Sequence, residues 1–76
     1  MNGLFPLAMT PPGSEVLVVD VRAGRGLSRK LMEMGFLPGT KVRVLMNGPG
    51  PVLVELMGSR VALGHGVAMK ILVRGG

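Results

Sequence analysis

The sequence predicts a mainly β fold, a small closed barrel of about five short strands with one short helix between the first and second strands. Three observations lead to it. Short runs rich in β-branched residues recur, proline–glycine pairs separate them, and 13 of the 76 residues are glycine. Short strands divided by turn signals are typical of small barrels. A barrel also removes the exposed strand edges that an apolar sheet must avoid. We expect residues 1–76 to form a single domain.

The first 21 residues predict a lead-in, a turn and a strand. Residues 1–10 are apolar without a period, and we expect Leu4, Leu7 and Met9 to pack onto the core as an extended segment. Pro12-Gly13 fits the central positions of a type II turn, where glycine supplies a positive φ. The valine-rich run over residues 15–21 then predicts a strand that is nearly apolar on both faces.

A short helix is predicted over residues 27–34, because apolar residues recur there at i, i+4 and i+7 and so share one face. This face consists of Leu27, Leu31 and Met34. Ser28 is the expected N-cap, and Gly35 fits a left-handed C-terminal cap. About two turns of helix are marginal in isolation, so this helix must be held by packing.

The second half of the chain predicts four more strands. Pro38-Gly39 repeats the type II turn signal, and residues 41–45 alternate with Val42 and Val44 inward. Further strands are expected over residues 51–57, 60–63 and 70–73. We expect Gly58-Ser59 to form a type II′ hairpin turn, and residues 64–68 to form a tight bend or one helical turn.

Composition limits the functional classes. The net charge of +5 favours an acidic partner, whether a protein face, anionic lipid or nucleic acid. Two phenylalanines with no tyrosine or tryptophan argue against a base-stacking surface or a proline-peptide groove. There is no cysteine and no apolar run of the ~20 residues that a membrane helix needs. We therefore expect a cytoplasmic protein.

The segment Gly24-Arg25-Gly26 follows the valine-rich run as a dinucleotide-binding loop would. The expected third glycine is replaced by Arg29, and the predicted helix is too short for a βαβ crossover. We interpret this segment as a sharp turn between strand and helix, which glycine makes possible.

We expect no catalytic residues, no cofactor and no metal site. His65 is the only histidine, and the four carboxylates show no suggestive spacing. Seven methionines could suggest a soft Cu(I) site, but methionine more often fills cores. We expect that role here, with Met34 on the core face of the helix.

The best candidate for a functional surface is a basic cluster in the predicted loop and helix. The candidate partner-binding residues are Arg22, Arg25, Arg29, Lys30 and Glu33. Glu33 can pair with Arg29 or Lys30 along the helix. Two interpretations stay open, a solvated helix face and a surface that docks on an acidic partner.

Three segments resemble one known family. Residues 29–42, RKLMEMGFLPGTKV, look like the signature of the ferrous iron transport protein A family (FeoA), in which a helix ending R-L-x-E-L/M-G runs into x-x-P-G and a strand. PGSEV at 12–16 resembles the family's opening turn, and ALGHGVAMKILV at 62–73 resembles its closing segment. The resemblance covers about residues 7–74, in order.

The resemblance implies an SH3-like barrel and a cytoplasmic accessory protein without catalysis. Its implied partner is the cytoplasmic part of the ferrous iron transporter FeoB, which includes a GTP-binding domain, and its implied role is to promote or regulate Fe²⁺ uptake. We expect no nucleic-acid partner, contact with the membrane only through FeoB, and a monomer or weak homo-oligomer.

Three alternatives remain. The same barrel occurs as the C-terminal module of metal-dependent repressors related to the diphtheria toxin repressor, so a stand-alone module of transcriptional regulation is one. Small basic barrels also bind RNA, which is the second. The third is a metal-sensing protein, which a titration with Fe²⁺ or Zn²⁺ would test.

Overall fold

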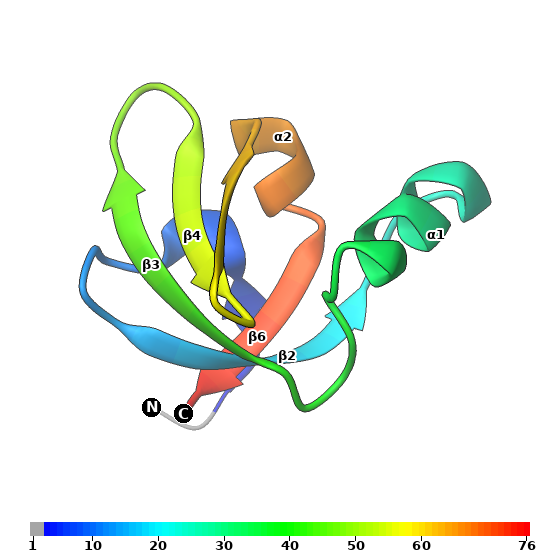
Figure 1. The fold of residues 1–76 in the computed structure, drawn as a ribbon, viewed down its shortest axis with the longest axis horizontal. Coiled ribbons are helices and arrows are strands. Elements are labelled where there is room, and N and C mark those ends of the chain that lie inside the picture. Colours follow the sequence, from blue (N-terminus) through cyan, green and yellow to red (C-terminus); the bar gives the residue numbers. More distant parts are fainter. Residues whose placement is uncertain (1–2) are drawn as a thin grey trace.

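The computed structural model describes residues 3–76, and these form one antiparallel sheet of six strands with short helices beside it (Figure 1). The strand order is β1-β6-β2-β3-β4-β5. Along the chain the elements are β1 (Phe5–Pro6), the 3-10 helix η1 (Leu7–Met9), β2 (Glu15–Val21), α1 (Arg25–Glu33), β3 (Lys41–Asn47), β4 (Val52–Leu56), β5 (Ser59–Leu63), α2 (His65–Ala68) and β6 (Ile71–Gly75). The predicted mainly β class is confirmed, as is the helix between the first two long strands.

The last strand joins the two ends of the described chain. β6 pairs with β1 through Phe5↔Val73 and with β2 through Val18↔Val73. The sheet curls around its interior, and α1 stands to one side of it (Figure 1). The series of strand pairs runs from β1 to β5, and within residues 3–76 these two strands do not pair with each other. The predicted closure of the barrel by strand pairing is therefore wrong, and β5 is at an end of the sheet.

The core consists of inward-facing side chains from alternate strand positions, closed by residues from the connecting segments. Val42 and Val44 are fully buried while Lys41 and Arg43 are exposed, which confirms the predicted alternation in β3. The largest core side chain is Phe36, which follows α1 and is fully buried. Fifteen aliphatic or aromatic residues form this single cluster.

The turns that depend on glycine are as predicted. Gly13 and Gly39 have φ angles of +88° and +90°. Each turn is closed by a hydrogen bond, from the Ser14 N–H to the Pro11 carbonyl at 3.3 Å and from the Thr40 N–H to the Leu37 carbonyl at 3.0 Å. These are the φ pattern and bond of type II turns. Gly35 ends α1 with a φ of +110°, which confirms the left-handed cap.

The β4–β5 hairpin differs from the prediction by one residue. The closing pair is Leu56↔Ser59, so the central residues are Met57 and Gly58, with φ angles of 52° and 79°. Two positive φ angles define a type I′ turn, whose twist matches that of the flanking strands. The predicted type II′ turn at Gly58-Ser59 is wrong, because the strand pairing places a methionine where glycine or asparagine is usual.

The N-terminal lead-in is only partly as predicted. Leu7 is fully buried, but Leu4 is 52% exposed and Met9 is 66% exposed, so these two do not pack into the core. The segment is also more regular than the expected extended chain, because it contains β1 and η1. Its first two residues lie outside the described part of the chain.

The start of the helix was predicted too late. α1 begins at Arg25 with Gly24 as its N-cap and without a side-chain capping hydrogen bond. Ser28 lies inside the first turn, and its backbone N–H donates to the Gly24 carbonyl at 2.8 Å. The prediction of Ser28 as the cap is therefore wrong. The apolar spacing marked the packed part of the helix, and the exposed first turn extends beyond it.

The methionines do not fill the core. All six within residues 3–76 are exposed: Met9, Met32, Met34, Met46, Met57 and Met69. The expectation of methionine as core filler is wrong, including Met34 on the core face of the helix. The narrow interior is occupied by valine, leucine, isoleucine, alanine and phenylalanine, which leaves the longer thioether side chains on the surface.

Candidate docking surface

The basic residues of α1 are carried by a helix that is anchored through its apolar side chains. Leu31 is 1% exposed and Leu27 packs against the core from a partly buried position. Just beyond the helix, the Phe36 N–H donates to the Leu31 carbonyl at 3.0 Å, which ties the helix to the buried phenylalanine. With these side chains directed inward, Arg25, Arg29 and Lys30 are left exposed to solvent.

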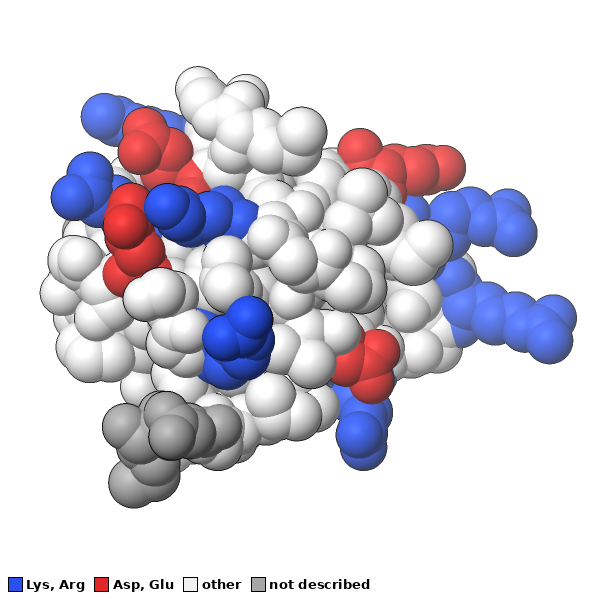
Figure 2. Space-filling model, turned by 90° about the horizontal axis from the view of Figure 1, so that it is seen from below, with Lys and Arg blue, Asp and Glu red and all other residues white. Residues whose placement is uncertain are grey.

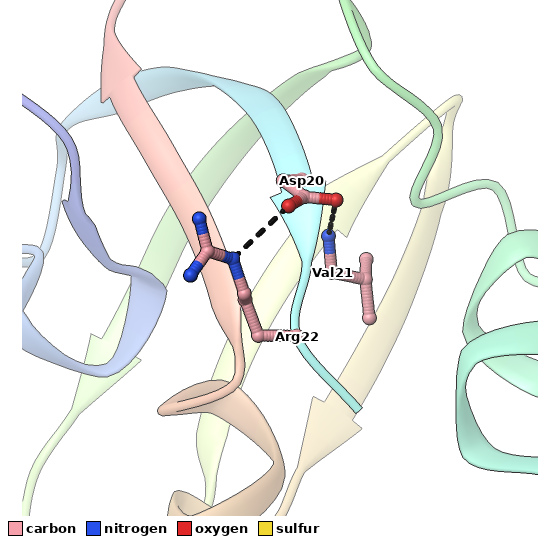
Figure 3. A network of polar contacts seen from close by, with 3 residues as sticks. All are labelled: Asp20, Val21 and Arg22. Atoms are coloured by element: carbon pink, nitrogen blue, oxygen red, sulfur yellow. Dashed lines mark hydrogen bonds and ion pairs between the residues drawn. The ribbon is translucent and has the colours of Figure 1, made fainter. Parts of the chain in front are cut away.

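Arg22 differs from the other cations of the cluster because it has a partner of its own. Its Nε lies 3.1 Å from Oδ2 of Asp20, and Oδ1 of the same carboxylate accepts the backbone N–H of Val21 at 2.9 Å (Figure 3). Both ionic side chains are more than half exposed, so this pair contributes little to stability. Arg22 is therefore partly neutralised, and the free positive charge lies on the helix.

The expected pairing of Glu33 is absent. Among residues 3–76 one ion pair forms, and it joins Arg22 to Asp20. Arg25, Arg29 and Lys30 thus have no carboxylate partner within the described chain. Basic side chains extend from the end of the molecule that carries α1, where acidic side chains are also visible, and basic and acidic side chains are intermixed at the other end (Figure 2).

An apolar groove lies beside this basic face, with a volume of about 210 Å³. One wall is α1, through Leu27, Leu31 and Met34, and the other includes Leu63 of β5 and Val67 of α2. Lys30 is the charged residue of its lining. The sequence did not reveal this groove, because its walls come from segments about 30 residues apart that only the fold brings together.

Two carboxylates that seemed scattered in the sequence share one surface of the sheet. The strand register places Glu15 opposite Arg43, Arg43 opposite Glu55, and Glu55 opposite Arg60. Charges of opposite sign therefore alternate across four strands, as cross-strand pairing favours. Each carboxylate faces a cation rather than another acid, so this ladder suits sheet stability better than metal binding.

The described residues contain no cluster of side chains suited to holding a metal ion. No group of three or more histidine, cysteine, aspartate or glutamate residues gathers within residues 3–76. His65 is exposed at the first position of α2. In the same range, no helix has the length and apolar character needed to cross a membrane.

Comparison with known proteins identifies the family. The model of the FeoA domain matches residues 5–75.

The chain belongs to the FeoA family.

A relative from Methanocaldococcus jannaschii, provisionally named Fe(2+) transport protein A, is 43% identical over 70 residues, which cover 92% of this chain and 85% of the relative. The crystal structure of an iron uptake regulatory protein, FeoA, superposes with a TM-score of 0.85 and 34% identity, covering 95% of this chain and 96% of that one. Stenotrophomonas maltophilia FeoA bound to zinc, described as an SH3 domain protein, gives a TM-score of 0.82 and 31% identity, with 91% and 88% covered. The FeoA fold expected from the sequence, an SH3-like barrel, is confirmed.

The similarity of this chain to a transcriptional repressor is limited to the fold. A manganese-dependent transcriptional repressor superposes with a TM-score of 0.89, but at 22% identity, and this chain spans 38% of that protein. The barrel is therefore shared between FeoA proteins and a module of a larger regulator.

Proposed function

We propose that this protein is a non-catalytic accessory protein of ferrous iron uptake in the cytoplasm. In this role it docks on the cytoplasmic part of the transporter FeoB and promotes or regulates Fe²⁺ transport. Family membership supports the link to iron transport, as does the name of the M. jannaschii relative. The S. maltophilia protein has likewise been suggested to act as a ferrous iron transport activating factor.

The observation that carries the docking proposal is the unpaired positive face of α1. Arg25, Arg29 and Lys30 are exposed and lack carboxylate partners within the described chain. Arg25 also occupies the first helical position, where the helix dipole favours an acidic residue. Helix stability alone would not select this arrangement. An acidic surface on the partner gives these charges a function.

The adjoining groove supports a protein as the partner. It supplies apolar contact area beside the charges, and such a combination is typical of the centre and rim of a protein interface. RNA binding is less well supported, because Phe36 is fully buried and Phe5 packs against the core. Neither ring is free to serve as a platform for stacking bases.

A matched pair of charge reversals tests this docking face. The variant R29E/K30E should weaken binding to the isolated cytoplasmic GTP-binding domain of FeoB by about tenfold or more, because two attractive contacts become repulsive. The control K41E/R74E makes the same change in net charge at exposed residues that flank Leu17 on the sheet. It should bind within about twofold of the unmodified protein if charge position matters more than total charge.

Binding would be followed by NMR titration of the labelled protein, which also locates the contact. Shifts concentrated on residues 22–36 are expected. Equal loss of affinity in both variants would mean that net charge, and not this face, determines binding. Unchanged affinity in R29E/K30E would show that docking uses another surface, and no binding by the unmodified protein would overturn docking on this domain.

A further inference from the structure

The outer edge of β5 has unused backbone hydrogen-bonding groups. β5 pairs with β4 in a regular register from Leu56↔Ser59 to Val52↔Leu63, and it is the end strand of the sheet. In an antiparallel pair, facing residues alternate between exchanging both hydrogen bonds and exchanging none. The Leu56↔Ser59 pair closes the two-residue turn and is a bonded pair. It follows that Val61 and Leu63 bond to β4.

The same alternation directs Arg60 and Ala62 away from β4. Their backbone N–H and C=O groups point to the open side of the strand. Within residues 3–76, no hydrogen bond outside the regular elements involves either residue. Both are exposed to solvent. Two donors and two acceptors therefore form a short free edge, the kind of feature that accepts a further strand.

This edge opens onto the apolar groove. Ala62 is part of the groove lining, together with Leu31 and Met34 of the facing helix. A strand added to β5 would direct alternate side chains toward these residues, because successive side chains in a strand point to opposite faces. The edge supplies main-chain hydrogen bonds and the groove supplies a pocket. Peptide binding by strand addition uses this combination.

The charges around the site indicate the occupant. Lys30 lines the groove, Arg29 and Arg25 extend from the same helix, and Arg60 lies on the edge itself. No carboxylate is part of the groove lining. A second copy of this chain, paired edge to edge, would bring two such sets of cations together. An incoming strand with acidic residues would instead meet complementary charge.

We propose that β5 is a docking edge that takes up an extended segment, with apolar residues alternating with acidic ones, as an added strand of the sheet. The apolar side chains enter the groove against α1, and the acidic ones face Lys30 and Arg60. That this segment belongs to the cytoplasmic part of the transporter rests on the function proposed above. The binding mode itself does not depend on the identity of the partner.

Amide hydrogen exchange tests the mode directly. Two probes would be used with the unmodified protein: the cytoplasmic GTP-binding domain of FeoB, and a capped octapeptide that alternates valine and glutamate. Strand addition should slow exchange at the amides of Arg60 and Ala62 by about tenfold or more, because each gains an acceptor. Val61 and Leu63 already bond to β4 and should change little.

A pair of variants at one position provides the matched control. Proline at an edge position is tolerated where the N–H faces solvent, so Ala62→Pro should fold but lose a donor and block the approaching strand. Ala62→Val keeps the N–H and favours the strand conformation. We expect A62P to weaken binding of either probe by about tenfold or more and A62V by less than about threefold. If A62P does not fold, the proposal is judged from amide exchange at Arg60 and Ala62 in the unmodified protein.

The outcomes separate this proposal from the previous one. If the domain binds without slowing exchange at Arg60 and Ala62, strand addition is overturned and docking stands. If the domain does not bind but the peptide slows exchange at these two amides, docking on that domain fails and the edge site stands. If neither probe slows their exchange at saturating concentration, or a valine–lysine peptide binds equally well, the proposed edge site is wrong.

Discussion

Gly35 is a position where the backbone conformation favours glycine and where the β4–β5 hairpin packs closely against the end of the helix. Its φ of +110° is one that other residues rarely adopt. A Cβ added there would lie 2.9 Å from the sulfur of Met57 and 3.3 Å from Cδ2 of Leu56. The cap of α1 therefore also determines how closely the β4–β5 hairpin approaches the helix.

We predict that Gly35→Ala lowers the free energy of unfolding by about 1–3 kcal/mol, through backbone strain and the contact with Met57. Gly13→Ala is the control, because its φ of +88° imposes strain while the space around it is open. Denaturant unfolding should show the larger loss for G35A. Adding Met57→Ala should recover part of the difference. Equal losses for G35A and G13A would show that packing at Gly35 contributes nothing.

At the scale of single residues, the sequence predicted what depends on local conformation. The positive φ angles of Gly13, Gly35 and Gly39 follow from turn and cap rules and are confirmed. The side chain of Asn47 could not be predicted in this way. Its Nδ2 donates to the carbonyls of Ala8 and Thr10, at 2.7 and 2.9 Å, across 39 and 37 residues of sequence. No local pattern encodes such a contact.

Among the elements, α1 depends most on a single anchor. Leu31 is its one fully buried side chain, whereas Met32, next in sequence, is 47% exposed. Nine residues of helix are too few to be stable without packing. The helix that carries the proposed docking charges therefore has one side chain fully inside the core, and Leu27 packs against the core from a partly buried position.

We predict that Leu31→Ala costs about 2–4 kcal/mol of unfolding free energy, because it leaves a cavity beneath the helix. Met32→Ala should cost less than about 1 kcal/mol, since an exposed side chain loses little buried area. Thermal and denaturant unfolding would measure both. Similar values for the two variants would contradict the assignment of Leu31 as the anchor.

The elements also show where prediction from sequence ends. Alternation identified β3, and its inward residues are confirmed, because burial imposes the period on the sequence. The run of β-branched residues identified β2. The start of α1 and the position of the hairpin turn were each misplaced. The exposed first turn of α1 has no apolar period, so the sequence pattern does not mark where the helix begins. The hairpin turn is set by strand register, which places Met57 in a turn position that local preference assigns to glycine.

For the whole molecule, charge is distributed unevenly. The sheet surface carries its charges as alternating signs, whereas α1 carries cations without partners in the described chain. The alternating charges of the sheet nearly cancel at a distance, whereas the cations of α1 produce a positive potential that attracts an acidic partner. The sequence predicted the basic helix face, but the alternating ladder and the groove appear only after folding.

We predict that docking on the transporter domain weakens steadily as the salt concentration rises from about 50 to 300 mM. Over this range the Debye length shortens, so the attraction between charges that face each other across the interface without direct contact is increasingly screened. The R29E/K30E variant should show a much smaller salt dependence. Isothermal titration calorimetry at several salt concentrations would measure both. An affinity of the unmodified protein that is independent of salt would argue for docking dominated by the apolar groove.

The surface position of the methionines has a chemical consequence. A peroxide can oxidise an exposed thioether to a sulfoxide without any unfolding, and every methionine within residues 3–76 is exposed. The hydrophobic core contains no sulfur, so such oxidation would leave its packing intact. Met34, by contrast, lines the groove, where a sulfoxide would place a polar group in an apolar wall. Oxidation of Met34 would thus alter the proposed docking groove while the barrel beneath it keeps its shape.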